Sequence, residues 1–390
     1  MAELDTILAK HTDPETGKLK GASFIAVNKE GKVIYSKAAG RLTFDTNKEE
    51  PLKTDSLCFI ASMTKLATAV AAMQLVEQGR IGLDDDVRAI VPALKDIEVL
   101  RGFEDDKSVD DGNTHAPPAD DSRLGKSTRS IKPSKPILEK VKNKITLRLL
   151  LTHSTGFCYD GSHPLLVKWS KVKQRTANTF SGSIDGYTHP LLFQPGEAWM
   201  YGPSIDWAGQ VVEALTKQTL GEYMEKNIWS KLGATNTTFH PERCRNMLPP
   251  QMDMGFRKNR SAPLTKGSNP YANPAPGDMG GIGLYSTADD YIKLLAALIT
   301  GGGPLLQKES VDELLRPQLG EESLKSMKEI FQQPSGWGGL WGKGIDGDYA
   351  LAGSVNLGDV PGRRKKGSIN WGGMPNLHWV SHDNACLGMC

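Results

Sequence analysis

The feature that most constrains the fold is an apolar, alanine-rich stretch from Cys58 to Gly79 that carries a serine and a lysine three positions apart. Apolar residues recur in it at spacings of three and four, the alanines favour a helix, and Gly79 suits the helix end. Side chains three positions apart share one face of a helix, so Ser62 and Lys65 can meet. The stretch therefore predicts a helix with a hydroxyl and an amine side by side in its first turn.

This pair is a candidate activated nucleophile. Free backbone N–H groups and the positive end of the helix dipole favour an alkoxide on Ser62. Lys65 can act as a base only where desolvation or a nearby cation lowers its pKa. The alternative is an ordinary N-capping serine beside a solvated lysine, and the same spacing recurs at Ser170 and Lys173. The spacing alone leaves both interpretations open.

The charge of the chain is nearly balanced, with 47 Lys and Arg against 45 Asp and Glu, a net charge of +2. This balance gives no electrostatic argument for a nucleic-acid or membrane partner. No apolar run approaches the roughly 20 residues of a membrane span, and the first residues lack a secretory signal pattern, so we expect a cytoplasmic protein. The cysteines are scattered, which predicts reduced thiols and no zinc site. They are Cys58, Cys158, Cys244, Cys386 and Cys390.

Several segments around this helix have their own patterns. Residues 3–12 predict a short helix and residues 23–36 a β-hairpin. Residues 103–144 carry an acidic run and then a basic run with prolines and little apolar periodicity, so we expect a mobile surface insertion there. A helix capped by Thr146 follows. We interpret His153 behind it as a hydrogen-bonded structural histidine and not a general base, because no acidic residue that could orient it is in view.

Two later segments offer further chemistry. Tyr201 stands at a turn before a predicted helix over 205–215, where its phenol can project into a cavity and move a proton; a buried aromatic with a satisfied hydroxyl is the alternative. Residues 367–380 predict two strands joined by a glycine turn, in which backbone N–H groups can approach a ligand as an oxyanion hole requires. The G-x-G-x-x-G match at 342–347 has no strand and helix around it, and predicts a hairpin turn.

The three features stand in one order along the chain: Ser62-x-x-Lys65, then the turn that begins at Tyr201, then Trp371-Gly-Gly. This order resembles the serine β-lactamase/penicillin-binding-protein superfamily, in its class C and esterase branch. Within that branch the likeness is greatest to the fungal acyltransferases of lovastatin-type polyketide biosynthesis. Nearly the whole chain shares it.

The resemblance implies an α/β (mixed α+β) fold of the β-lactamase/transpeptidase type, with a central antiparallel sheet flanked by helices. It implies that residues 1–85 and 280–390 build the sheet domain, and that residues 86–279 form a mostly helical insert domain. It implies no metal or organic cofactor. The family also continues past the position of Cys390, so we expect a truncated or unusual C-terminus.

Carried over by position, the resemblance implies that Ser62 is the acyl-accepting nucleophile and that Lys65 and Tyr201 share the acid and base work. The backbone N–H groups of Ser62 and Met374 would hold the oxyanion. The remaining residues that the resemblance assigns to the oxyanion and substrate region are Gly373, Trp371 and Phe59.

Two departures concern the substrate. Ser204 stands where the acyltransferase pattern carries asparagine, and Phe59 stands where that pattern carries an arginine that contacts the polyketide acceptor. The leading hypothesis is a serine acyltransferase that moves an acyl group from a thioester or ester to an alcohol of a small polyketide-like molecule. Hydrolysis of small esters is the second hypothesis. A β-lactamase or peptidase is a third, disfavoured by the absence of Lys-Thr-Gly, and a non-enzymatic binding protein is the fourth. Whether an acyl-carrier-protein domain presents the donor stays open.

Overall fold

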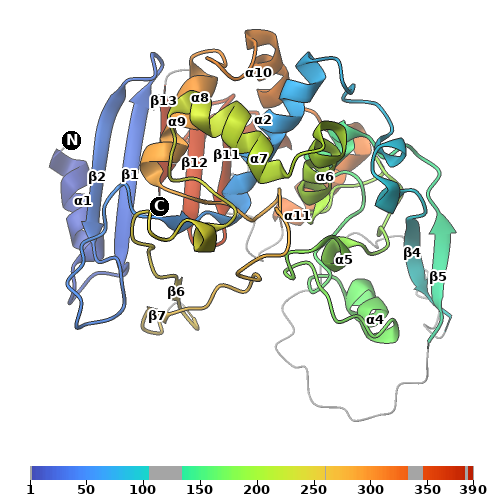
Figure 1. Cartoon of the computed structure of the whole chain (residues 1–390), viewed down its shortest axis with the longest axis horizontal. Helices are drawn as coiled ribbons and strands as arrows, with labels where there is room; N and C mark the ends of the chain where they lie inside the picture. The colour runs from blue at the N-terminus through green and yellow to red at the C-terminus, as the bar shows by residue number, and fades with distance from the viewer. Residues whose placement is uncertain (1, 105–133, 260, 333–345, 383–384, 390) are drawn as a thin grey trace.

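The computed structural model describes residues 2–104, 134–259, 261–332, 346–382 and 385–389. A seven-stranded antiparallel sheet takes its strands from both ends of the chain, in the order β2-β1-β13-β12-β11-β10-β9 (Figure 1). The first strand of the chain therefore pairs with the last one that is described. The strands are β1 Gly21–Asn28, β2 Val33–Gly40, β9 Gly347–Tyr349, β10 Ser354–Asn356, β11 Ile369–Gly373, β12 Leu377–His382 and β13 Ala385–Met389.

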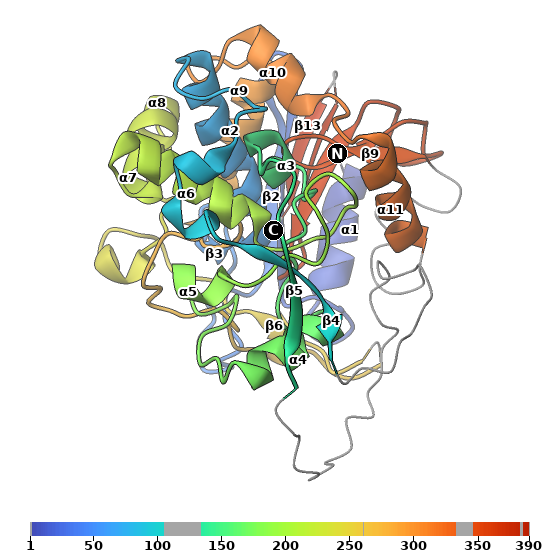
Figure 2. The same cartoon turned by 90° about the vertical axis from the view of Figure 1, so that its right-hand side faces the viewer.

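Helices lie against the two faces of this sheet. α1 (Ala2–Thr12) packs on β1 and β2, α9 (Ala288–Ile299) packs on β1 and β13, and Figure 2 shows them on opposite sides of the strands. This mixture of helices and a central sheet confirms the expected fold class. The other α-helices are α2 Thr64–Glu77, α3 Leu147–Leu151, α4 Pro164–Val172, α5 Ile184–Tyr187, α6 Ser204–Thr216, α7 Leu220–Met224, α8 Ser230–Leu232, α10 Lys308–Leu315 and α11 Glu321–Gln332.

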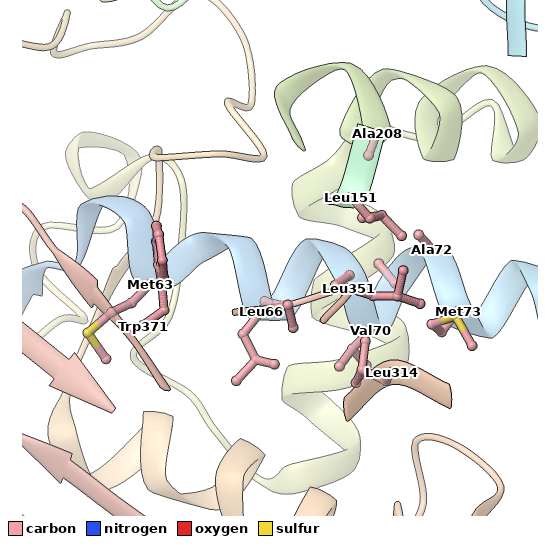
Figure 3. Packing of buried hydrophobic residues seen from close by; sticks show 14 of the residues in the cluster. Met63, Leu66, Val70, Ala72, Met73, Leu151, Ala208, Leu314, Leu351 and Trp371 are labelled. Carbon is pink, nitrogen blue, oxygen red and sulfur yellow. The ribbon is translucent and has the colours of Figure 1, made fainter. Parts of the chain in front are cut away.

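Helix α2 is the centre of the main hydrophobic core. Every residue from Thr64 to Leu75 is buried, so the helix is enclosed on all sides and not only along one stripe. Figure 3 shows Leu151 and Ala208 on one side of α2 and Leu314 on the other. Small alanine side chains allow this close approach from several directions. The predicted stop is confirmed, because Gly79 has a φ of +65° just beyond the last turn.

Short two-stranded pairs complete the strands. β3 (Cys58–Phe59) pairs with β8 (Tyr285–Ser286), and β6 (Gly255–Phe256) pairs with β7 (Thr265–Lys266). Strand β3 lies directly before the Ser62 turn in the sequence, and its partner β8 lies directly before α9. The pair therefore ties that turn to the segment that leads into α9.

The prediction for residues 103–144 was wrong at its ends. β4 (Glu98–Phe103) pairs antiparallel with β5 (Pro136–Lys140), so residues 136–140 form a strand. Leu138 packs against a buried cluster that includes Leu100 and Phe103, and this apolar contact outweighs the charged composition around it. Residues 105–133 of the predicted insertion lie outside the described residues.

Other expectations have mixed outcomes. The helix at residues 3–12 and the hairpin at 23–36 are confirmed as α1 and the β1–β2 pair. Most of the G-x-G-x-x-G match at 342–347 lies outside the described residues, as does Cys390. Among the described side chains, Cys58, Cys158 and Cys244 take part in no disulfide bond. None of the described helices is both long enough and apolar enough to cross a membrane.

Candidate active site

Four of the predicted site residues meet at one place, brought there by three separate parts of the chain. Ser62 lies in a 3-10 turn (Ala61–Met63) that runs directly into α2, and Lys65 lies in the first turn of α2. Tyr201 precedes α6, and Trp371 lies in the middle of β11. These distant parts of the chain come together because α2 packs against α6 and β11 packs against the Ala61–Met63 turn.

The Ser62 hydroxyl is held between two partners. The Lys65 Nζ donates a hydrogen bond to Ser62 Oγ at 3.1 Å, and the Tyr201 hydroxyl donates one at 2.7 Å. The Trp371 Nε1 in turn donates to the Tyr201 oxygen at 3.3 Å. Ser62 is only 9% exposed, so these contacts lie in a largely water-free setting, where they are stronger than in water. One hydroxyl with both an amine and a phenol in reach can lose a proton and later recover it.

Lys65 is fully buried, and three groups surround its amine. Besides Ser62, its Nζ donates to the Gly281 carbonyl at 2.7 Å and lies 4.7 Å from the centre of the Tyr201 ring. A buried ammonium is costly unless polar groups replace its water shell. The carbonyl dipole and the face of the ring supply part of that replacement, and they also fix the direction in which the amine points.

The turn that carries Ser62 is held in an uncommon conformation. Ala61 has a φ of +44°, in the left-handed region that residues with a Cβ seldom adopt. The Thr64 hydroxyl donates to the Ala61 carbonyl at 2.6 Å and accepts from the Leu284 N–H at 3.1 Å. The Tyr291 hydroxyl also donates to the Met63 carbonyl at 2.9 Å. Side chains from α2 and α9 thus hold the backbone on both sides of Ser62.

Strand β11 lies very close to the same turn. A Cβ added to Gly373 would lie 2.4 Å from the Ile60 carbonyl oxygen, so only glycine allows this approach. Met374 follows in the turn to β12, with its side chain 52% exposed. The turn itself is formed by Met374, Pro375 and Asn376, so the predicted glycine turn is wrong in detail: the glycines lie on the strand, where they bring its backbone against the Ser62 segment.

An unbroken series of aromatic rings runs from Tyr201 to Phe59. Tyr159 lies 5.5 Å from Tyr201 between ring centres, Phe180 lies 5.8 Å from Tyr159, Tyr271 lies 4.8 Å from Phe180, and Phe59 lies 5.4 Å from Tyr271. Phe59 is itself buried, whereas Phe180 and Tyr271 are half-buried. We call this series of rings the aromatic wall. Phe59, which stands where the resemblance expects an arginine, is therefore part of it.

His153 packs beside Tyr201 and lacks the side-chain hydrogen bonds that we expected. It is fully buried, its ring lies 4.7 Å from that of Tyr201, and neither ring nitrogen has a hydrogen-bond partner among the described residues. Burial and then the nearby Lys65 charge lower its pKa well below the ordinary value of a histidine, so the ring is neutral. The predicted hydrogen-bonded role was wrong, because aromatic neighbours such as Trp199 and Tyr349 pack against the ring in edge-on contacts.

The sequence argument missed Asp206. This residue is 1% exposed on α6, and one carboxylate oxygen accepts the Gly281 N–H at 2.9 Å. Burial raises its pKa to about 6, an effect that the Lys65 charge opposes. On the predicted helix at 205–215, Asp206 shares a face with Gln210 and Glu213, so the sequence pattern predicts an exposed side chain and gives no signal of its burial.

Two other candidate sites have no support. Ser170 and Lys173 lie at the end of α4, where Ser170 contacts Arg175 at 3.5 Å. Within the described ranges, no group of three or more His, Cys, Asp or Glu side chains is placed to hold a metal ion.

Comparisons with known proteins show the family of the chain. Residues 8–381 match the sequence model of the beta-lactamase family. The chain is 35% identical to a lovastatin esterase from Penicillium rubens, over 96% of this chain and 89% of that protein. It is 31% identical to a monacolin J acid methylbutanoyltransferase from Aspergillus terreus, over 96% of this chain and 85% of that protein. The structure of simvastatin synthase from Aspergillus terreus superposes with a TM-score of 0.84 at 29% identity, covering 100% of this chain and 92% of that one.

Fold, site and relatives together define an enzyme of the acyltransferase and esterase class, acting on small molecules. The chain belongs to the beta-lactamase family. The expected superfamily and branch are thereby confirmed.

Proposed function

We propose that this protein is a serine acyltransferase that moves an acyl group from a thioester or ester through an acyl-Ser62 intermediate to an alcohol of a small polyketide-like molecule. The observation that carries the proposal is the Ser62 Oγ held by Lys65 Nζ at 3.1 Å and by the Tyr201 hydroxyl at 2.7 Å. The names of the relatives, which include both methylbutanoyltransferases and an esterase, support the same chemistry.

Acylation of Ser62 is the first half of the reaction. Ser62 Oγ attacks the carbonyl carbon of the donor, and its proton passes to the coupled pair of Lys65 and Tyr201. The tetrahedral intermediate then collapses, the bond to the leaving thiol or alcohol breaks, and the pair returns the proton to that leaving group. The position of Tyr201, between Ser62 and the Trp371 N–H, suits a phenol that carries negative charge for part of the cycle.

Deacylation repeats these steps in reverse with a new partner. The acceptor hydroxyl gives its proton to the same pair, its oxygen attacks the acyl-Ser62 carbonyl, and Ser62 leaves with the proton restored. We assign the oxyanion to the backbone N–H groups of Ser62 and Met374, supported by the tight packing of Gly373 against Ile60. Loss of one such donor in other enzymes costs about 3 kcal/mol.

The aromatic wall favours an apolar substrate. Phe180 and Tyr271 are half-buried and continue the series of rings from Tyr159, and Phe59 packs against Tyr271. A polycyclic or alkyl skeleton gains from contact with such rings, whereas a carboxylate gains nothing from them. We therefore assign Phe59 and Trp371 to the substrate region, where Phe59 favours the uncharged part of an acceptor or ester.

Hydrolysis is the second candidate function, and a specific observation favours it. The relative with 35% identity is a lovastatin esterase, and hydrolysis differs from transfer only in that water takes the place of the alcohol. The lovastatin skeleton joined to its acyl side chain by an ester is thus a suitable test substrate for both directions.

The experiment that separates the two functions measures how one acyl group is divided between two acceptors. The protein receives a 2-methylbutanoyl thioester with and without monacolin J, and both the new ester and the free acid are quantified by mass spectrometry. We expect ester formation to exceed release of free acid in the presence of the alcohol, and Ser62→Ala to form neither. If only free acid forms at every alcohol concentration, the protein is an esterase.

Two finer points belong to the same proposal. We propose that a small-molecule thioester is the acyl donor; the alternative is that a carrier-protein domain presents the acyl group. Comparing the same acyl group on a carrier protein and on a short pantetheine thiol tests this.

We also propose a cytoplasmic location, which the absence of disulfide bonds at Cys58, Cys158 and Cys244 supports. Fractionation of the producing cells tests it directly.

A further inference from the structure

The backbone at Gly280 and Gly281 is held by side chains from two helices. The Thr68 hydroxyl of α2 donates to the Gly280 carbonyl at 2.6 Å, and Asp206 of α6 accepts the Gly281 N–H at 2.9 Å. One peptide group is therefore bound at both its oxygen and its N–H. The next carbonyl, that of Gly281, accepts from Lys65 at 2.7 Å. The position of the Lys65 amine thus depends on a backbone segment that Thr68 and Asp206 fix.

Asp206 also places a negative charge in the interior next to this amine. Its second carboxylate oxygen is buried and has no hydrogen-bond partner among the described residues. A Cβ on Gly281 would lie 2.4 Å from that oxygen, so the carboxylate sits directly against the backbone. The groups that face Asp206 from neighbouring elements are Lys65 of α2, Tyr187 of α5, Tyr159 and Tyr271, of which Lys65 carries the one positive charge.

We propose that Asp206 is a positioning residue for acyl transfer: it fixes the Gly281 backbone that directs the Lys65 amine at Ser62, and it supplies the buried countercharge for that amine. This inference rests on the proposed function, since it assigns a task to Asp206 through Lys65. A buried carboxylate with one unpaired oxygen costs stability, and a role at the site explains why it is present.

The test is the pH dependence of the reaction of Ser62 with a fluorophosphonate, in which Ser62 Oγ displaces fluoride from phosphorus, followed by intact-mass detection on wild type, Asp206→Asn and Asp206→Ala. The asparagine keeps the shape and an oxygen for the Gly281 N–H but removes the charge. A buried negative charge opposes the loss of a proton from the groups around it, so its removal makes that loss easier. We expect the acidic limb of the rate profile to move to lower pH by about one unit in Asp206→Asn. In Asp206→Ala the hold on Gly281 is also lost, and the maximal rate falls about 100-fold.

A matched control is Asp290→Asn in α9. Asp290 is also buried and also accepts a backbone N–H, that of Asn236 at 2.6 Å, but its charged neighbour is Lys293. We expect Asp290→Asn to change the unfolding temperature and to leave the acidic limb in place. A limb that moves equally in both variants would mean a general effect of net charge and would overturn the inference.

A second variant keeps the inference testable if Asp206→Asn does not fold. Thr68→Val removes the hydroxyl that holds Gly280 without changing any charge, so the reaction slows while the acidic limb stays in place. A wild-type rate in folded Thr68→Val, or superimposable profiles for wild type and Asp206→Asn, would overturn the positioning role. If wild type forms no adduct on Ser62, the proposed function itself fails. If wild type forms the adduct but the Asp206 and Thr68 variants behave as wild type, only the role of Asp206 fails.

Discussion

The contact between β11 and the Ser62 turn makes a sharp prediction for Gly373→Ala. The new Cβ would lie 2.4 Å from the Ile60 carbonyl oxygen, whereas a carbon and an oxygen in ordinary contact are at roughly 3.3 Å or more. One of the two segments must move by about 1 Å. The Ile60 carbonyl accepts the Met63 N–H at 3.1 Å and so closes the turn around Ser62, which means that the displacement reaches the nucleophile directly.

The expected loss follows from that displacement. A misplacement of about 1 Å at a reacting group costs about 100-fold in rate, or about 2.7 kcal/mol of activation free energy. Overpacking of this kind also costs about 1–3 kcal/mol of stability. We therefore expect Gly373→Ala to remain folded at 25 °C, with kcat for a p-nitrophenyl acyl ester lowered about 100-fold.

Gly358→Ala is the matched control. It adds the same methyl group in the loop between β10 and β11, where a Cβ would have no neighbour within 4 Å. We expect wild-type kcat for this variant. The reasoning would be refuted by Gly373→Ala with a kcat within threefold of wild type, or by an equal loss in both variants.

Three further predictions concern the site and its surroundings. Tyr201→Phe removes the hydroxyl 2.7 Å from Ser62 Oγ and should lower kcat/KM for the same ester about 1,000-fold with little change in unfolding temperature; a loss under tenfold would remove Tyr201 from the acid–base pair. Burial raises the pKa of Asp206 from 3.8 to about 6, so ionisation of Asp206 destabilises folded wild type by an amount that grows from about pH 4 and levels off above pH 6, roughly 3 kcal/mol in all. Over that interval the unfolding free energy of Asp206→Asn should therefore rise relative to that of wild type. A difference that does not change with pH would contradict this prediction. Burial raises the pKa of the Cys158 thiol to about 12, so iodoacetamide at pH 8 should leave Cys158 unmodified in the folded protein, as peptide mass mapping can check.

Much of the fold could be predicted because local patterns and tertiary packing agree. The helix after Ser62 has both helical spacing and helix-forming residues, and it is present as α2. The β1–β2 hairpin was likewise visible as two apolar runs with a polar turn. The strand β5 was missed because its pattern is short and its stability comes from contact of Leu138 with distant residues such as Phe103.

Residue spacing along the sequence predicted only the part of the candidate site that lies at one helix start. Ser62 and Lys65 lie on one turn, so their contact follows from helix geometry. Tyr201 and Trp371 were recognised through the order of motifs, because no local rule states that they meet. Asp206 acts through the Gly281 backbone, and a contact between a side chain and a distant glycine leaves almost no trace in a single sequence.

The central claim is that Ser62 carries the acyl group. The most direct measurement is rapid-quench intact-mass analysis of the protein mixed with a p-nitrophenyl acyl ester, with the modified residue located by peptide mapping. We expect one acyl group per chain on the peptide that contains Ser62, formed as fast as the p-nitrophenolate burst and absent in Ser62→Ala. An acyl group that persists in Ser62→Ala, or turnover by that variant at the wild-type rate, would contradict it.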